Sequence, residues 1–255
     1  MCTEKPRILV TNDDGYDAPG LWALVGALEP LGDLIVAAPD REQSATAHAL
    51  TLNRPLRAIE VEPDRYRIDG TPTDCVHLAV RQLTGGRLPD LVASGINRGL
   101  NIGDDLTYSG TVAGALEGAL LHIPAVALSA ASDGKGGADY THASAFAGAI
   151  CADILGRGLE PGVLLNVNVP GVEPRGVRVT RQGTRTYRAT AEERLDPSGR
   201  PYYWIAGVDM TPAGELDGDH VAIADGFVSV TPLHANLTHE PSLERLAKWT
   251  LELPR

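Results

Sequence analysis

"RILVTNDDGYDAPG" (residues 7–20) joins a short apolar run to a polar turn and then to the start of a helix pattern. Residues 7–11 have the continuous apolar character of a buried strand. A helix is predicted over 19–31, because Pro19 suits a first helical turn and apolar residues follow at helical spacing. A strand that passes through a polar turn into a helix is the beginning of an α/β unit.

The same alternation continues through most of the chain. Helix patterns and short apolar runs follow one another, with the runs at 34–38, 90–94, 125–129 and 163–170 and the helices at 74–83, 110–121 and 139–155. Runs that are apolar on both faces and separated by helices are typical of parallel strands. The sequence therefore predicts an α/β fold with a doubly wound, mostly parallel, Rossmann-like sheet.

The region after Pro170 has a different character. Residues 177–207 are basic and rich in Thr and Tyr, and they contain a Pro-Ser-Gly-Arg turn between strand-like segments. This pattern predicts a β-hairpin arm, which we place at 184–207. One more strand is expected at 226–233 and a C-terminal helix at 242–253, and we expect a single domain over 1–255, with the terminal helix inside 240–255.

Composition narrows the possible functions. The chain has 255 residues, a formal net charge of −11 and 43% hydrophobic residues, which are the properties of an ordinary globular protein. Excess negative charge disfavours binding to nucleic-acid polymers and to anionic membranes. The three cysteines have no CxxC spacing, and the N-terminus does not resemble a signal peptide. We therefore expect a reduced, cytoplasmic enzyme.

Adjacent carboxylates in the first turn need an explanation. Asp13 and Asp14 repel each other, and each pKa unit of unfavourable shift costs ~1.4 kcal/mol. A polar turn followed by a helix cap would require only one such residue. A bound divalent cation would offset the repulsion, so the pair favours a metal site.

Two further loops are expected beside this turn, because ligands bind at the carboxyl ends of the strands of an open α/β sheet. The loop at 39–52 carries Ser44, and the loop at 95–111 carries Asn97 and Asn101. Hard cations such as Mg²⁺ prefer carboxylate, amide and hydroxyl oxygens. The predicted metal ligands are therefore Asp13, Asp14, Ser44 and Asn97, with Asp13 also the candidate catalytic group.

Ser109, Gly110 and Thr111 open the helix predicted at 110–121. The free N–H groups and the positive end of a helix dipole suit a phosphate group. Capping of the helix by Ser109 or Thr111 is the simpler alternative. Beside a metal site, phosphate binding becomes the favoured interpretation.

Long motifs extend this pattern over nearly the whole chain: "ILVTNDDG", "APDREQSATAHALTL", "GTPTDCV", "SGINRGLNIGDDLTYSGTVAGALEG", "IPAVALS", "NVNVP", "VTRQG", "DPSGRPYYWIAG" and "GFVSVTPL". In content and order they resemble the survival protein SurE family. The resemblance implies a nucleotidase that hydrolyses nucleoside 5'- and 3'-monophosphates with one divalent ion, Mg²⁺ or Mn²⁺, per subunit, and in some members also polyphosphate. It also implies phosphate handling by Asn101 and a homodimer or homotetramer built through the C-terminal arm. Ala45 departs from the glycine that usually follows the ligand serine, which affects the backbone of the loop and leaves the ligand side chain intact.

Three other functions remain open. Nucleoside hydrolases also place aspartates after the first strand, but they need a D-x-D-x-x-x-D-D spacing. Phosphatases that form an aspartyl-phosphate need acids two apart, whereas Asp13 and Asp14 are adjacent. A non-catalytic nucleotide sensor would use the same pocket without turnover.

Overall fold

The computed structural model describes residues 5–135, 137–213 and 217–249, with the side chains of 185–190 and 206–213 left out. Its strands are β1 (Arg7–Thr11), β2 (Asp33–Pro39), β3 (Ala58–Glu62), β4 (Arg65–Ile68), β5 (Leu91–Arg98), β6 (Ala125–Ala130), β7 (Val163–Val169), β8 (Val177–Val179), β9 (Thr184–Leu195), β10 (Pro201–Ala213) and β11 (Val228–His234). Its helices are α1 (Pro19–Leu28), α2 (Pro72–Leu78), α3 (Gly110–Leu120), α4 (Thr141–Arg157), α5 (Asp219–Ala224) and α6 (Glu240–Leu246).

The larger sheet has nine strands within the described residues, in the order β3-β4-β2-β1-β5-β6-β7-β11-β8. Strands β2, β1, β5, β6 and β7 pair in parallel, as the sequence predicts. Antiparallel pairs flank this parallel part, β3 with β4 on one side and β11 with β7 on the other, and β8 forms the second edge by pairing in parallel with β11. The α/β prediction is confirmed, and the strand order places β1 and β5 side by side near the centre of the sheet.

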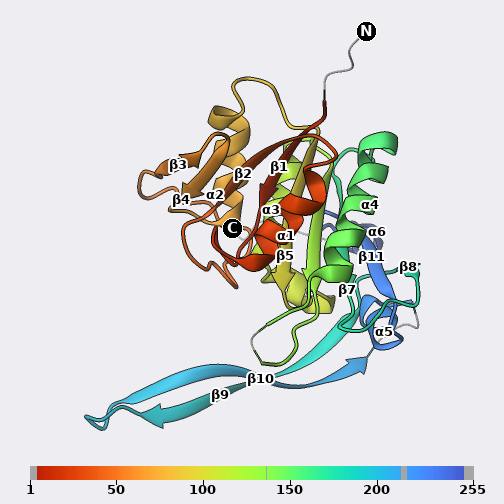
Figure 1. Ribbon diagram of the computed structural model, residues 1–255. Coiled ribbons are helices and arrows are strands. Elements are labelled where there is room, and N and C mark those ends of the chain that lie inside the picture. The colour runs from red at the N-terminus through yellow and green to blue at the C-terminus, as the bar shows by residue number, and fades with distance from the viewer. Residues whose placement is uncertain (1–4, 136, 214–216, 250–255) are drawn as a thin grey trace, which may run out of the picture.

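Helices cover both faces of this sheet (Figure 1). Ile8 and Val10 of β1 belong to one apolar cluster with residues of α1 and α4, whereas Leu9 belongs to a second cluster with residues of α2 and α3. Alternate residues of a strand point to opposite faces, so a strand buried on both sides needs an unbroken apolar run. The doubly wound arrangement follows from this pattern.

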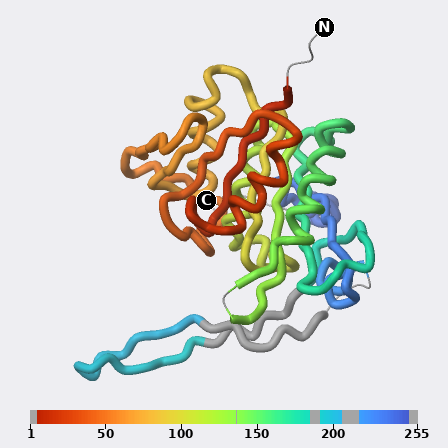
Figure 2. The backbone as a smooth tube through the Cα atoms, in the orientation of Figure 1, coloured from red at the N-terminus to blue at the C-terminus, as the bar shows by residue number. Residues whose placement is uncertain are grey.

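The predicted hairpin is present as β9 and β10, which form a separate two-stranded sheet. Figures 1 and 2 show it extending away from the rest of the molecule. Two boundaries differ from the prediction: residues 177–179 pair with β11 in the large sheet, and β10 continues to Ala213. The terminal helix ends at Leu246, and residues 250–255 lie outside the described residues.

Two further findings bear on the predictions from composition. None of the helices in the described part of the chain is long and apolar enough to cross a membrane. Cys75 and Cys151 are buried free thiols, while Cys2 lies outside the described residues. Burial raises the pKa of both thiols, that of Cys151 to about 12, so these cysteines are inert core residues.

Candidate functional site

The polar loops after β1, β2 and β5 meet at one cavity of about 290 Å³. The cavity lies at the carboxyl ends of these strands, where ligands bind in open α/β sheets. Its walls include all four predicted metal ligands and two of the predicted phosphate-binding residues: Asp13, Asp14, Ser44, Asn97, Asn101 and Ser109. The structure thus brings together residues from positions 13 to 109 of the sequence.

Asp13 follows β1 directly and is only 4% exposed. Its turn is held by Asn12, whose Nδ2 donates to the Gly15 carbonyl (2.8 Å), and by the Gln43 N–H, which donates to the Asp13 carbonyl (2.7 Å). The Thr111 hydroxyl donates to Asp13 Oδ1. A Cβ atom at Gly110 would lie 2.9 Å from Asp13 Oδ2, so the first turn of α3 packs directly against this carboxylate.

The carboxylate pair is electrostatically unfavourable as it stands. The pKa of Asp13 is raised from 3.8 to about 6. Burial is the largest cause and the charge of Asp14 adds to it, while the hydrogen bond from Thr111 opposes both. Burial also raises the pKa of Asp14, although the Arg98 N–H donates to its Oδ2 (3.1 Å) and partly offsets this. A cation between the two carboxylates would remove both penalties.

Ser44 lies on the loop that follows β2. Its hydroxyl donates to Glu42 Oε1 (2.9 Å), which places a third carboxylate at the rim of the cavity. The next residue, Ala45, has φ = 58°, a left-handed conformation in which glycine is favoured. The difference between Ala45 and the glycine usual in the family therefore falls at a position where the backbone requires a positive φ.

Asn97 lies near the end of β5. The pairing of β5 with β6 shifts register between Ser94 and Asn97, an irregularity of the kind that often re-aims side chains beside active sites. Asn97 Nδ2 donates to the Gly99 carbonyl (2.9 Å), which leaves the amide oxygen as the atom that can bind a cation.

The donor atoms around the cavity fit a hard divalent cation. They comprise carboxylate, hydroxyl and amide oxygens, which are the ligands of Mg²⁺ and Mn²⁺. Among the described residues that line this cavity there is no His or Cys. The site therefore lacks the imidazole and thiolate ligands typical of zinc.

Asn101 is fixed mainly through its backbone. Its carbonyl accepts from the Nδ2 atoms of Asn166 (2.9 Å) and Asn168 (3.0 Å), and its N–H donates to Asn168 Oδ1 (2.8 Å). Its own Nδ2 donates to the Ser129 hydroxyl (2.9 Å). The sequence of the "NVNVP" segment predicts only a strand, but its two alternate asparagines hold the backbone of Asn101 in place. Their spacing of two along a strand is the signal that could have identified them.

Ser109 is the N-cap of α3, and its hydroxyl accepts from the Val112 N–H (3.1 Å). The capping alternative is thus correct for Ser109, and its hydroxyl hydrogen still can donate to a ligand. Thr111 bonds to Asp13 instead. Of Ser109, Gly110 and Thr111, only Ser109 lines the cavity, and Thr111 is fully buried. The first N–H groups of α3 have no partner within the helix, and helix ends of this kind bind anions.

The site loops are anchored by residues that the sequence did not single out. Oxygen atoms of Glu117 lie 3.0 Å from His48 Nε2 and 2.8 Å from His77 Nδ1. Burial alone would raise the pKa of Glu117, but the two imidazoles outweigh it and hold the pKa below its ordinary value. Asp74 accepts from the N–H (2.8 Å) and hydroxyl (2.6 Å) of Thr51. The Ser44 loop is thereby fixed to α2 and α3.

The loop that follows Asn101 has an anchor of its own. Asp219 is fully buried, and it accepts from the N–H groups of Gly103 (2.8 Å) and Gly183 (3.0 Å). The Gln182 side chain donates to the Gly103 carbonyl (3.0 Å). This anchor joins the loop to the residues immediately before β9.

Comparison with known proteins is consistent across sequence and structure. The chain is 51% identical to a 5'-nucleotidase SurE of Geobacter metallireducens over 95% of this chain and 97% of the relative. It is 48% identical to that of Syntrophotalea carbinolica over 96% and 97%. A crystal structure of SurE protein from Aquifex aeolicus superposes with a TM-score of 0.84 at 42% identity, covering 94% of this chain and 98% of that one.

A family model described as survival protein SurE matches residues 8–189. That range contains the carboxylate pair, the Ser44 loop and the first turn of α3. The chain belongs to the survival protein SurE family.

Proposed function

We propose that this chain is a divalent-metal-dependent phosphomonoesterase that hydrolyses nucleoside 5'- and 3'-monophosphates to nucleoside and inorganic phosphate. The relatives named 5'-nucleotidase support the substrate class. One observation carries the proposal: two mutually repelling carboxylates, Asp13 buried and Asp14 half-buried, face a polar cavity beside the N-terminus of a helix. This arrangement pairs a cation site with an anion site, as hydrolysis of a phosphate ester requires.

Asp13, Asp14, Ser44 and Asn97 would hold the metal, which is proposed to be a single Mg²⁺ or Mn²⁺ ion per subunit. When bound, it would neutralise charge on the phosphoryl oxygens and lower the pKa of water. Asn101 and the first turn of α3, at Ser109, Gly110 and Thr111, would hold the phosphate.

The protein groups supply positioning and proton transfer. Asp13 would orient the attacking water and accept its proton at Oδ2, because Oδ1 already accepts from Thr111. The helix N–H groups of α3 would stabilise the negative charge that develops on the phosphoryl oxygens. Burial of Asp13 excludes bulk water from this side of the site.

A panel of nucleotides assayed for inorganic phosphate and for free base, each with Mg²⁺, Mn²⁺ and EDTA, tests this function. Phosphate release that requires metal supports it. Release of free base would identify a nucleoside hydrolase, and tight nucleotide binding without turnover would identify a sensor. Short polyphosphate belongs in the same panel, since we propose it as a second substrate.

Assembly and location are also proposed and need separate tests. A homodimer or homotetramer that uses the hairpin is supported by the exposed tip of the arm, where Tyr203 and Trp204 are each 59% exposed. Tyr187 also lies in the arm, but its side chain is outside the described residues. A cytoplasmic location remains a prediction from composition.

A further inference from the structure

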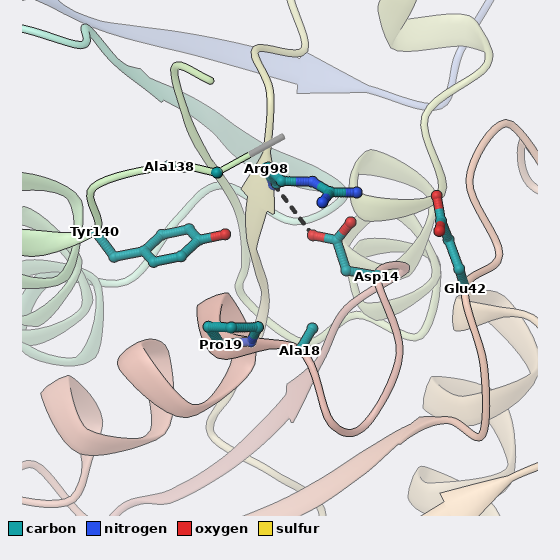
Figure 3. A pocket seen from close by; sticks show the side chains of 8 residues that line it. Asp14, Ala18, Pro19, Glu42, Arg98, Ala138 and Tyr140 are labelled. Carbon is teal, nitrogen blue, oxygen red and sulfur yellow. Dashed lines mark hydrogen bonds between the residues drawn. The ribbon is translucent and has the colours of Figure 1, made fainter. Parts of the chain in front are cut away.

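The loop that carries Ser44 has little packing of its own. It comprises residues 40–57, which join β2 to β3 and contain no helix or strand, and every one of these described residues is at least partly exposed. Figure 3 shows Glu42, near the start of this loop, on the side of a cavity opposite Tyr140, with Asp14 between them. The conformation of this wall of the site therefore depends on hydrogen bonds more than on apolar packing.

The backbone next to Ser44 is in an unfavourable conformation. Ala45 has φ = 58° and Ala47 has φ = 52°. Residues with a Cβ atom seldom adopt this left-handed conformation, and they keep it only where the surrounding contacts impose it. Without such contacts this part of the loop would relax, and Ser44 would move with it.

The side chains of residues 44–48 make few contacts beyond the loop. The hydroxyls of Ser44 and Thr46 bond to other residues of the loop. His48 Nε2 lies 3.0 Å from Glu117 Oε2 on α3, and no other side chain of this described stretch has a hydrogen bond to a different element. The Glu117 side chain is only 7% exposed, so the contact ties the loop to a buried carboxylate.

Helix α3 also contacts the carboxylate pair. The Thr111 hydroxyl, in its first turn, donates to Asp13 Oδ1, and Glu117 lies further along the same helix. One rigid element therefore holds both Asp13 and the part of the loop that carries Ser44. His48 lines a separate cavity of about 270 Å³ rather than the cavity of the proposed metal ligands, so it can act on a cation only through the loop.

We propose that His48 is a positioning residue for the metal site, an inference that rests on the proposed function. Its contact with Glu117 holds residues 44–48 in the conformation that keeps Ser44 beside Asp13, and this contact thereby sets the affinity of the site for a divalent cation. Residues that support a metal ligand in this way typically contribute about 10- to 100-fold to metal affinity.

His77 provides a matched comparison. Its Nδ1 lies 2.8 Å from the other carboxylate oxygen of Glu117, but it belongs to α2 and not to the Ser44 loop. Burial opposes ionisation of Glu117, and the two imidazoles together outweigh burial and hold its pKa below the ordinary value. Loss of either imidazole therefore weakens the support of the same buried carboxylate, but only loss of His48 releases the loop.

The test measures Mn²⁺ binding by calorimetry in the absence of nucleotide. His48→Ala should raise Kd about tenfold, whereas His77→Ala should leave Kd within about twofold of wild type, because α2 carries none of the proposed ligands. His48→Gln should retain most of the affinity, since the new amide can still donate to Glu117. In a Ser44→Ala background, His48→Ala should change Kd by less than about twofold, because the two residues act through one ligand.

Limited trypsin digestion in EDTA tests the loop without metal. Arg41 lies in the loop and its side chain is 66% exposed, so cleavage after this residue reports local opening. Cleavage should be faster in His48→Ala than in His77→Ala. Urea unfolding of both variants checks that they are folded and that their overall stabilities are comparable.

The proposal is wrong if His48→Ala and His77→Ala have the same Kd for Mn²⁺, or if His48→Ala weakens binding as much in the Ser44→Ala background as in wild type. A wild-type protein that binds no Mn²⁺ would instead refute the metal site of the proposed function. The trypsin comparison then decides by itself whether His48 holds the loop: faster cleavage in His48→Ala supports this, and equal cleavage rejects it.

Discussion

Replacing Asp13 with asparagine has opposite expected effects on stability and on turnover. Burial and the neighbouring Asp14 raise the pKa of Asp13 from 3.8 to about 6. At a pH above both values, a shift of about two pKa units corresponds to ~3 kcal/mol of lost stability. The asparagine side chain would carry no charge and could still accept a hydrogen bond from Thr111, although a bond weaker by ~1 kcal/mol. Asp13→Asn should therefore raise the free energy of unfolding of the metal-free protein by ~2 kcal/mol at pH 7.5.

The pH dependence follows from the sign of the shift. The folded protein binds the Asp13 proton more tightly than the unfolded chain does, so wild-type stability falls as the pH rises from about 4 to about 6. The variant lacks this loss, so its advantage should shrink as the pH falls and should reverse near pH 4, where only the ~1 kcal/mol cost of the weaker hydrogen bond remains. Mn²⁺ should reverse the order at pH 7.5, because ligand binding at about 100 times Kd adds ~2.7 kcal/mol to a protein that retains the site.

Urea unfolding followed by circular dichroism measures both effects, in EDTA and in Mn²⁺, at one fixed protein concentration. Turnover of the variant should fall by at least ~10²-fold, the usual loss for a positioned base. Asp33→Asn, an exposed carboxylate at the start of β2, is the matched control and should change stability by less than about 0.5 kcal/mol. A variant that is less stable than wild type in EDTA at pH 7.5, or that is folded and nearly fully active, would refute the reasoning.

Four further outcomes are expected. Ser44→Ala and Asn97→Ala should each shift the midpoint of a Mn²⁺ titration of the rate to higher concentration while retaining turnover at saturating metal; unchanged midpoints in both would exclude them as ligands. Ser109→Ala should weaken inhibition by inorganic phosphate by about fivefold, as expected for one neutral hydrogen bond, and loss of the cap should lower the free energy of unfolding by ~1 kcal/mol; identical inhibition would count against phosphate binding there. Ala45→Gly should raise the free energy of unfolding by ~1 kcal/mol, because glycine adopts φ = 58° without strain, and a loss of stability in urea would contradict this. Replacing residues 184–213 with a short Gly-Ser turn should lower the mass measured by light scattering, and no change would remove the hairpin from the proposed interface.

The central sheet could be predicted because its strands are buried on both faces and therefore consist of unbroken apolar letters. The β3–β4 hairpin could not, because every residue of β3 is exposed and its charged residues give no burial signal. Helix α5 has six residues, too few to establish a helical period. Local sequence thus determined the buried elements and left the short or exposed ones unpredicted.

The residues of the candidate site also fall into those that the sequence could predict and those that it could not. Residues that directly follow strands, such as Asp13 and Asn97, could be placed because topology fixes where the ends of parallel strands lie. Glu117 and Asp219 could not, since the partners described above lie 36 to 116 residues away in the chain and no local spacing encodes those contacts. Their polar character alone would have suggested exposed residues.

The hydrogen bonds of Asp219 connect a loop of the candidate site to the hairpin that we propose as the subunit interface. A single carboxylate binds N–H groups of Gly103, in the loop beside the site, and of Gly183, at the root of the arm. Neither segment can shift by itself without breaking a hydrogen bond to a buried charge, at a cost of ~1.5–3 kcal/mol. If a neighbouring subunit immobilises the arm, it also restricts the motion of this loop. Linkage is reciprocal, so whatever association contributes to substrate affinity, the bound substrate contributes equally to association.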